Sequence, residues 1–144
     1  GSAGQASGGA GTAGGRPVKS IGGTEFGRNV ADYALQFVGG PYQYGGSDPH
    51  TGVDCSGFTR YVYQHGAGIT LNRSSRGQAL QGKEISADQM RPGDLLFYGS
   101  KSNIDHVAMY IGEGKIVHAS TERTGITISN WNYRNPVKIR SIME

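Results

Sequence analysis

The sequence predicts an α+β fold in which helices come first and a mostly antiparallel sheet follows. Two helical patterns occupy the first half of the folded region, and short apolar strand patterns separated by tight turns occupy the second half. A parallel sheet would instead alternate strands and helices along the chain. The 144 residues give room for one domain.

The first helix is expected at residues 28–38, because its apolar residues recur at the helical spacing. Glycine and proline at 39–41 then break the pattern. The residues of its buried face are Ala31, Ala34, Leu35 and Val38.

A second helix is expected to begin near Cys55 and to stop at Gly66 and Gly68. Its apolar face is formed by Phe58, Tyr61, Val62 and His65. Residues 71–81 are polar and predict a loop or a short irregular helix. After a turn at 91–94, strands are expected at 95–98, 106–111, 115–119, 126–128 and 137–139.

The strands 106–111 and 115–119 predict a hairpin that carries two histidines. A three-residue loop at 112–114 would pair Ile111 with Lys115. In that register His118 lies diagonal to His106 on one face, about 7 to 8 Å away between backbones. A loop of two or four residues would move the imidazoles to opposite faces, because side chains alternate along a strand.

Cys55 is the single cysteine of the chain, and it stands at the expected start of the second helix. Unpaired N–H groups and the helix dipole favour a thiolate there, so we expect the pKa of the thiol to be lowered. His106 could take the thiol proton, and His118 could orient His106. The competing interpretation is a buried, inert cysteine.

The first 24 residues are rich in glycine, alanine and serine and predict a flexible linker or tail. The folded domain is therefore expected at residues 25–144. A linker of this kind at the start also suggests a fragment of a longer protein, with a further domain on its N-terminal side.

The net charge of +3 and a pI of about 9.1 are mild. Because no dense basic run is interleaved with aromatic residues, a nucleic-acid partner is not expected. No stretch reaches the roughly 18 to 20 apolar residues of a membrane-spanning helix. With one cysteine and no tight histidine spacing, neither a metal nor another cofactor is expected.

Six short motifs occur in a consistent order along the chain. They are YQYGG at 42–46, DCSGF at 54–58, RSSRGQ at 73–78, RPGDLLF at 91–97, DHVAMYIG at 105–112 and VHA at 117–119. Together they resemble the NlpC peptidase family of bacterial cell-wall cysteine endopeptidases. The resemblance implies a papain-like fold, in which the nucleophile begins a helix that packs on an antiparallel sheet.

By this resemblance Cys55 is the nucleophile, His106 the base and His118 the third, orienting residue. The implied substrate is a peptidoglycan stem peptide, cut between D-γ-glutamate and a diamino acid, and the implied location is secreted or at the bacterial cell surface. The residues expected to bind substrate are Tyr42, Asp54, Ser56, Arg73 and Ser75.

Three other functions stay open from the sequence. The chain could be an amidase of the same papain-like class that cuts the N-acetylmuramoyl–L-alanine bond. It could be a non-catalytic wall-binding module, with Trp131, Tyr133 and Arg134 forming a patch that faces glycan. An acyltransferase would use the same thioester chemistry on an amine acceptor.

Overall fold

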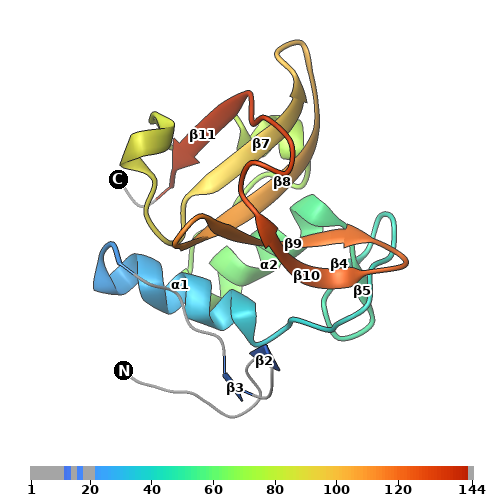
Figure 1. Ribbon diagram of the computed structural model, residues 1–144. Coiled ribbons are helices and arrows are strands. Elements are labelled where there is room, and N and C mark those ends of the chain that lie inside the picture. Colours follow the sequence, from blue (N-terminus) through green and yellow to red (C-terminus); the bar gives the residue numbers. More distant parts are fainter. Residues whose placement is uncertain (1–11, 14–15, 18–21, 143–144) are drawn as a thin grey trace.

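The computed structural model describes residues 12–13, 16–17 and 22–142 of the chain (Figure 1). The strands β2 (Thr12–Ala13) and β3 (Arg16–Pro17) pair with each other. The predicted linker at 1–24 otherwise lies mostly outside the described residues, so its flexibility stays a prediction.

The first helix, α1 (Glu25–Leu35), begins and ends three residues earlier than the sequence predicts. It begins early because the Thr24 hydroxyl accepts a hydrogen bond from the Gly27 N–H at 3.0 Å and caps the helix. Beyond Leu35 the chain tightens into a turn, and the Gly39 N–H bonds to the Ile126 carbonyl at 2.9 Å. That bond ties the end of the helix to the sheet.

The second helix, α2 (Cys55–Ala67), confirms the predicted start. Of the two glycines expected to stop it, Gly66 lies inside the helix and Gly68 follows its end. Asp54 caps its first turn, and Gly68 ends it in the left-handed conformation with a φ of 70°. The polar segment at 71–81 contains a short helix, α3 (Ser75–Gln78). A 3-10 turn, η1 (Ala87–Gln89), precedes strand β7 (Leu95–Ser100).

The main sheet has six antiparallel strands in the order β10-β9-β8-β7-β11-β6. Figure 1 shows α1 and α2 beside this sheet, and the small strand pair β4–β5 beyond the start of α2. The bounds are β4 (Ser47–Asp48), β5 (Gly52–Val53), β6 (Lys83–Glu84), β7 (Leu95–Ser100), β8 (Asn103–Gly112), β9 (Lys115–Thr121), β10 (Gly125–Asn130) and β11 (Lys138–Ser141). The α+β architecture predicted from the sequence is confirmed.

Two apolar clusters hold the domain together, one on each face of the strands. The larger cluster packs α1 and α2 against residues such as Phe97, Val107 and Val117. Alternate residues of the same strands, such as Tyr98, Ala108 and Ile116, build the smaller cluster. Because side chains alternate along a strand, His106 and His118 share the face of this smaller cluster.

The β8–β9 hairpin has a different loop from the predicted one. Gly112 pairs with Lys115, so the loop has two residues and the predicted pairing of Ile111 with Lys115 is wrong. A bulge at Ile111 restores the register, and Tyr110 then pairs with Ile116. The two histidines therefore keep one face in spite of the shorter loop.

β8 and β9 separate near the histidines. Their mutual pairing runs from the turn as far as Met109 and Val117, in the part of the chain that the structure describes. Beyond this point His106 pairs with Tyr98 of β7, and His118 pairs with Thr127 of β10. The first residue of α2, Cys55, can approach the sheet at this gap between β8 and β9.

We predict that Gly99→Ala destabilises the sheet beside His106. Gly99 has a φ of 127°, and an added Cβ would lie 2.5 Å from the carbonyl oxygen of Asn103. Alanine would strain the backbone at this φ, and its Cβ would clash with the carbonyl oxygen. The free energy of unfolding, measured by urea titration, should therefore fall by roughly 3 kcal/mol. Gly39→Ala is the matched control, because Gly39 has a φ of 95° but open space around it. It should cost only about 1 kcal/mol, and equal losses at the two positions would contradict the assignment of the larger loss to the clash.

Candidate active site

The Cys55 thiol lies at the first residue of α2 and is half-buried. The backbone N–H groups of Val107, Ser56 and Cys55 itself lie close enough to the sulfur to favour its charged form. Val107 follows His106 on β8, so the start of the helix reaches the strand at the gap between β8 and β9. The structure thus brings the predicted thiol next to the first of the two histidine motifs.

The pKa of the Cys55 thiol is raised, against the expectation that the helix start would lower it. Burial is the largest cause, because it disfavours the charged thiolate. The N–H groups of Val107, Ser56 and Cys55 oppose this effect, and the negative charge of Asp54 adds to it. The sequence indicated the helix start but not the depth at which the sheet buries the thiol.

His106 and His118 are in direct contact, as the hairpin predicts. Nε2 of His106 lies 2.8 Å from Nδ1 of His118, and the two rings meet edge to face. Only 8% of His106 and 1% of His118 are exposed. Because Nε2 of His106 is occupied by His118, Nδ1 is the nitrogen of His106 that remains for a reacting group.

Both imidazoles are held neutral near pH 7. Burial and the positive charge of Arg134 lower the pKa of His106 to about 4, and Asp105 partly opposes them. Burial and the neighbouring His106 lower the pKa of His118 to about 3. Two neutral rings can share one hydrogen bond only if one ring donates and the other accepts.

Ser129 contacts the far side of this pair, and the sequence analysis did not identify it. Its hydroxyl on β10 lies 2.9 Å from Nε2 of His118. No motif marks this residue, since its place depends on how β10 pairs with β9. The only sequence signal is a serine at the end of a short apolar strand.

Two tyrosines and an ion pair surround the imidazoles. The Tyr98 ring lies 5.9 Å from the His106 ring, and the Tyr133 ring lies 5.3 Å from the His118 ring. Arg134 binds the Asp105 carboxylate through both nitrogens, at 3.0 and 3.3 Å, and stands 5.6 Å from the Tyr98 ring centre. The segment after β10 therefore packs Tyr133 against His118 and holds Arg134 on the residue before His106.

Asp54, Ser56 and Arg73 form a polar cluster at the start of α2. Arg73 donates to both Asp54 oxygens, at 3.0 and 3.1 Å, and to the Ser56 hydroxyl at 3.0 Å. The Asp54 carboxylate also accepts from the backbone N–H groups of Gly57 at 2.8 Å and Gly45 at 3.1 Å. These bonds fix the helix start that carries the thiol.

Tyr42 is near the thiol, but Ser75 does not join the polar cluster. Tyr42 bridges to Val53 just before the helix, and burial together with the charges of Cys55 and Asp54 raises the pKa of its phenol. Ser75 begins α3, and the described structure gives it no hydrogen bond to the Asp54–Arg73 cluster. Gln78 supplies the link instead, because its buried amide donates to the Ser56 carbonyl at 3.0 Å.

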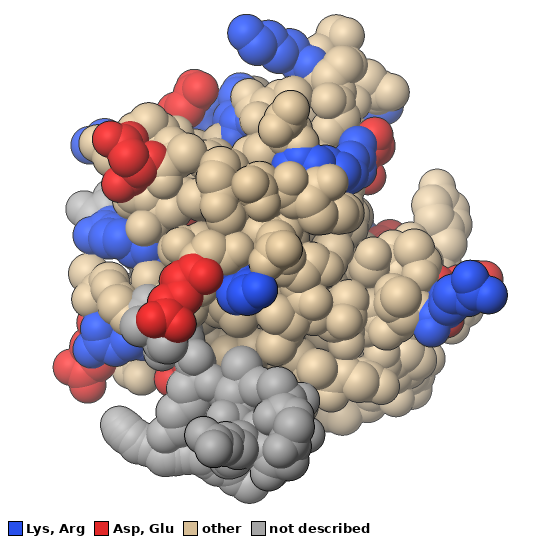
Figure 2. All heavy atoms as spheres, viewed as in Figure 1, with Lys and Arg blue, Asp and Glu red and all other residues tan. Residues whose placement is uncertain are grey.

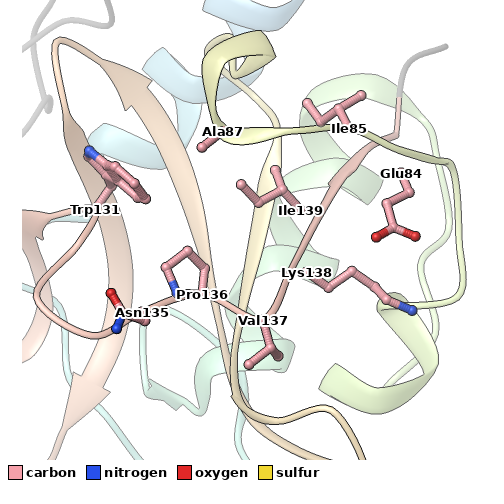
Figure 3. A pocket seen from close by; sticks show the side chains of 9 residues that line it. All are labelled: Glu84, Ile85, Ala87, Trp131, Asn135, Pro136, Val137, Lys138 and Ile139. Atoms are coloured by element: carbon pink, nitrogen blue, oxygen red, sulfur yellow. The ribbon is translucent and has the colours of Figure 1, made fainter.

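Figure 2 shows the surface notched beside the strand pair β4–β5, on the side where Figure 1 places the beginning of α2. Positive and negative side chains are interspersed on this face. A separate hollow of about 380 Å³, drawn in Figure 3, contains none of the predicted site residues. It is lined by Glu84, Ile85, Ala87, Trp131, Asn135, Pro136, Val137, Lys138 and Ile139.

The described part of the chain, residues 12–13, 16–17 and 22–142, contains neither a membrane-spanning helix nor a cluster of metal-binding side chains. None of its helices is long and apolar enough to span a membrane. It also holds no group of three or more histidine, cysteine, aspartate or glutamate side chains placed to bind a metal ion.

Comparisons with known proteins agree on one family. The sequence model of the NlpC/P60 family matches residues 39–140. The gamma-DL-glutamyl hydrolase of Bacillus subtilis is 37% identical over 69% of this chain and 24% of its own length. The bifunctional muramidase/DL-endopeptidase CwlT of the same organism is 39% identical over 73% of this chain and 32% of its own. The chain thus spans a third or less of these relatives.

Among solved structures, the NlpC/p60 domain of the peptidoglycan hydrolase SagA is similar in fold. It has a TM-score of 0.74 and 36% sequence identity, and the match covers 80% of this chain and 97% of that one. The predicted papain-like architecture is therefore confirmed by a structure of nearly the same extent as the folded region.

We predict that Asp54→Ala destabilises the domain by roughly 2 kcal/mol, because it removes the helix cap and leaves Arg73 without its carboxylate. Urea unfolding measures the loss. Thr24→Ala is the matched control, since it removes the cap of α1 without an ion pair, and it should cost about 1 kcal/mol. A loss at Asp54 no larger than that at Thr24 would mean that the contact with Arg73 adds no stability.

We predict that stability falls as the pH drops from about 6.5 toward 4, because of the two buried imidazoles. The unfolded chain takes up protons near the ordinary histidine pKa, whereas the folded chain resists until about pH 4. One such ring contributes roughly 3 kcal/mol above pH 6.5 that is lost by pH 4. Urea titrations at several pH values would measure the slope. The double variant His106→Asn, His118→Asn should have a shallower slope, and identical slopes would contradict the assignment.

Proposed function

Because the chain belongs to the NlpC/P60 family, we propose that it is a cysteine endopeptidase that hydrolyses peptidoglycan stem peptides at the D-γ-glutamyl–diamino acid bond. The observation that carries the proposal is the 2.8 Å contact between His106 and His118, beside a thiol that begins a helix. Relatives named as a gamma-DL-glutamyl hydrolase and a DL-endopeptidase support the choice of bond.

In the first step, Cys55 acts as nucleophile and His106 as base. The thiol sulfur attacks the carbonyl carbon of the scissile amide, while Nδ1 of His106 takes the thiol proton. Since both groups are neutral at rest, this transfer accompanies the attack. The backbone N–H groups at the start of α2 are the donors nearest to the oxyanion that forms.

The remaining steps return the enzyme to its starting state. His106 gives its proton to the leaving amine, the C–N bond breaks, and a thioester with Cys55 remains. A water molecule then attacks the thioester carbon and passes a proton to His106. The C–S bond breaks, the glutamyl carboxylate leaves, and the sulfur regains its proton. His118 keeps His106 oriented throughout.

Substrate contacts are proposed for Tyr42, Asp54, Ser56 and Arg73, which lie at or beside the start of α2. The Asp54 carboxylate already accepts from Gly57, Gly45 and Arg73. A substrate ammonium group would therefore displace one of these donors to bind there. Ser75, also proposed from the sequence, has no contact with this cluster and is the weakest member of the set.

The proposed domain runs from residue 25 to 144, and the proposed location is the bacterial cell wall, secreted or at the surface. The relatives are three to five times longer than their matched regions, which supports further domains in a full-length protein. A wall-binding or second hydrolase domain on the N-terminal side is consistent with the glycine-rich segment at 1–24. No nucleic-acid partner is proposed.

We predict that the native protein converts purified muropeptides into fragments that end in D-glutamate, and that Cys55→Ala does not. Removal of the nucleophile should lower the rate by at least a thousandfold. Mass spectrometry of the products identifies both the bond and the diamino acid. Cys55→Ser is a matched control, because it keeps the size of the side chain but replaces the thiol.

The same products separate the alternatives. A free L-alanine amine in place of a diamino acid amine would identify an amidase of the papain-like class. Products in which the acyl group is joined to an added amine acceptor would identify an acyltransferase. If no stem peptide is cut while both proteins sediment with cell walls, the chain is a wall-binding module and the peptidase proposal is wrong.

A further inference from the structure

His118 lies between two hydrogen-bonding partners and is almost fully buried. Its Nδ1 faces Nε2 of His106 at 2.8 Å, and its Nε2 faces the Ser129 hydroxyl at 2.9 Å. Ser129 reaches it because β10 pairs with β9 and puts Thr127 opposite His118 and Ser129 two residues further along the same face. The result is a continuous row of His106, His118 and Ser129.

The positions of the protons in this row determine whether His106 can act as a base. Nδ1 of His106 must be unprotonated to accept the thiol proton, so its neutral ring must carry its proton on Nε2. That proton is donated to Nδ1 of His118. His118 must then carry its own proton on Nε2, where Ser129 is the acceptor.

The reverse arrangement would be inactive. If His118 carried its proton on Nδ1, it would donate to Nε2 of His106 and force the His106 proton onto Nδ1. A serine hydroxyl can rotate to serve either arrangement. Once His106 has taken the thiol proton, however, both of its nitrogens are donors, and only the arrangement in which Ser129 accepts remains possible.

We propose that Ser129 is a positioning residue, which accepts the His118 Nε2–H, permits the tautomer that leaves Nδ1 of His106 free, and supports the His106 imidazolium. The inference rests on the proposed function. It goes beyond it by adding a fourth member to Cys55, His106 and His118. Ser129 acts only through His118 and does not touch the reacting atoms.

Other titratable groups also face the two rings, and they stay constant in the test. These groups are Tyr98 on β7, Asp105 on β8, and Tyr133 and Arg134 in the segment after β10, and Cys55 on α2 lies near Tyr133. Differences between variants at position 129 alone are therefore assigned to Ser129.

The test compares Ser129→Ala, which removes the acceptor, with Ser129→Asp, which can only accept. Ser129→Thr keeps the hydroxyl and should restore native behaviour. Thr127→Val is the matched control, because it removes a hydroxyl from the neighbouring position on the same face of β10. Circular dichroism first establishes which variants are folded, and the three substitutions at 129 keep the test informative if one of them does not fold.

Nitrogen-15 spectra of the histidines in the resting protein give the tautomers directly. In the native chain and Ser129→Thr we expect the His118 proton on Nε2 and the His106 proton on Nε2. In Ser129→Ala a mixture of tautomers should appear. The pH at which the pair gains a proton should fall in Ser129→Ala and rise in Ser129→Asp, because a carboxylate stabilises the charged form.

Kinetics on a stem peptide give the second readout. Ser129→Ala should lower kcat roughly tenfold and change KM by less than about twofold, because the lost bond acts on proton transfer and not on substrate binding. The acid limb of the kcat/KM profile should shift in the same directions as the spectra. Tautomers, protonation midpoint and kcat all unchanged in Ser129→Ala would overturn the proposal.

The proposed function and this inference can fail separately. If the native protein cuts stem peptides and Ser129→Ala behaves like it, the peptidase stands and the role of Ser129 is rejected. If the native protein cuts nothing but the tautomers change at position 129 as described, the hydrogen-bond row stands and the peptidase is rejected.

Discussion

The approach of the Val107 N–H to the Cys55 sulfur is the contact on which the site depends. A strand in a continuous sheet uses its backbone groups in the ladder, but β8 has parted from β9 at this point. The freed position lets a helix end meet a strand directly. Asp54 and Arg73 fix the helix side of the contact, and the β7–β8 pairing fixes the strand side.

Much of this arrangement could be predicted from the sequence, because it depends on local signals. The helix start at Cys55 follows from its cap residue, and its end at Gly68 follows from the left-handed conformation that glycine favours. The shared face of His106 and His118 was predicted correctly by way of a wrong loop. A two-residue turn and a bulge at Ile111 together give the same face as a three-residue loop. The face that the two histidines share could therefore be predicted, whereas the length of the loop between β8 and β9 could not.

What could not be predicted depends on contacts between distant segments. Ser129 reaches His118 only through the pairing of β10 with β9, which no motif encodes. The direction in which the pKa of the Cys55 thiol shifts could not be predicted either. A helix start favours a thiolate, whereas burial against the sheet favours the neutral thiol. The buried, neutral histidines have the same origin. Local sequence specifies the groups, and tertiary packing sets their charge.

In the proposed mechanism the Cys55 sulfur becomes acylated during turnover, with His106 as the base. Intact-protein mass spectrometry of a reaction quenched in acid within one turnover tests it, since the chain has a single thiol. We expect a mass increase equal to the acyl half of the peptide, located on Cys55 and absent in His106→Ala. Peptide cleavage with no adduct on Cys55, at a rate that Cys55→Ala retains, would contradict it.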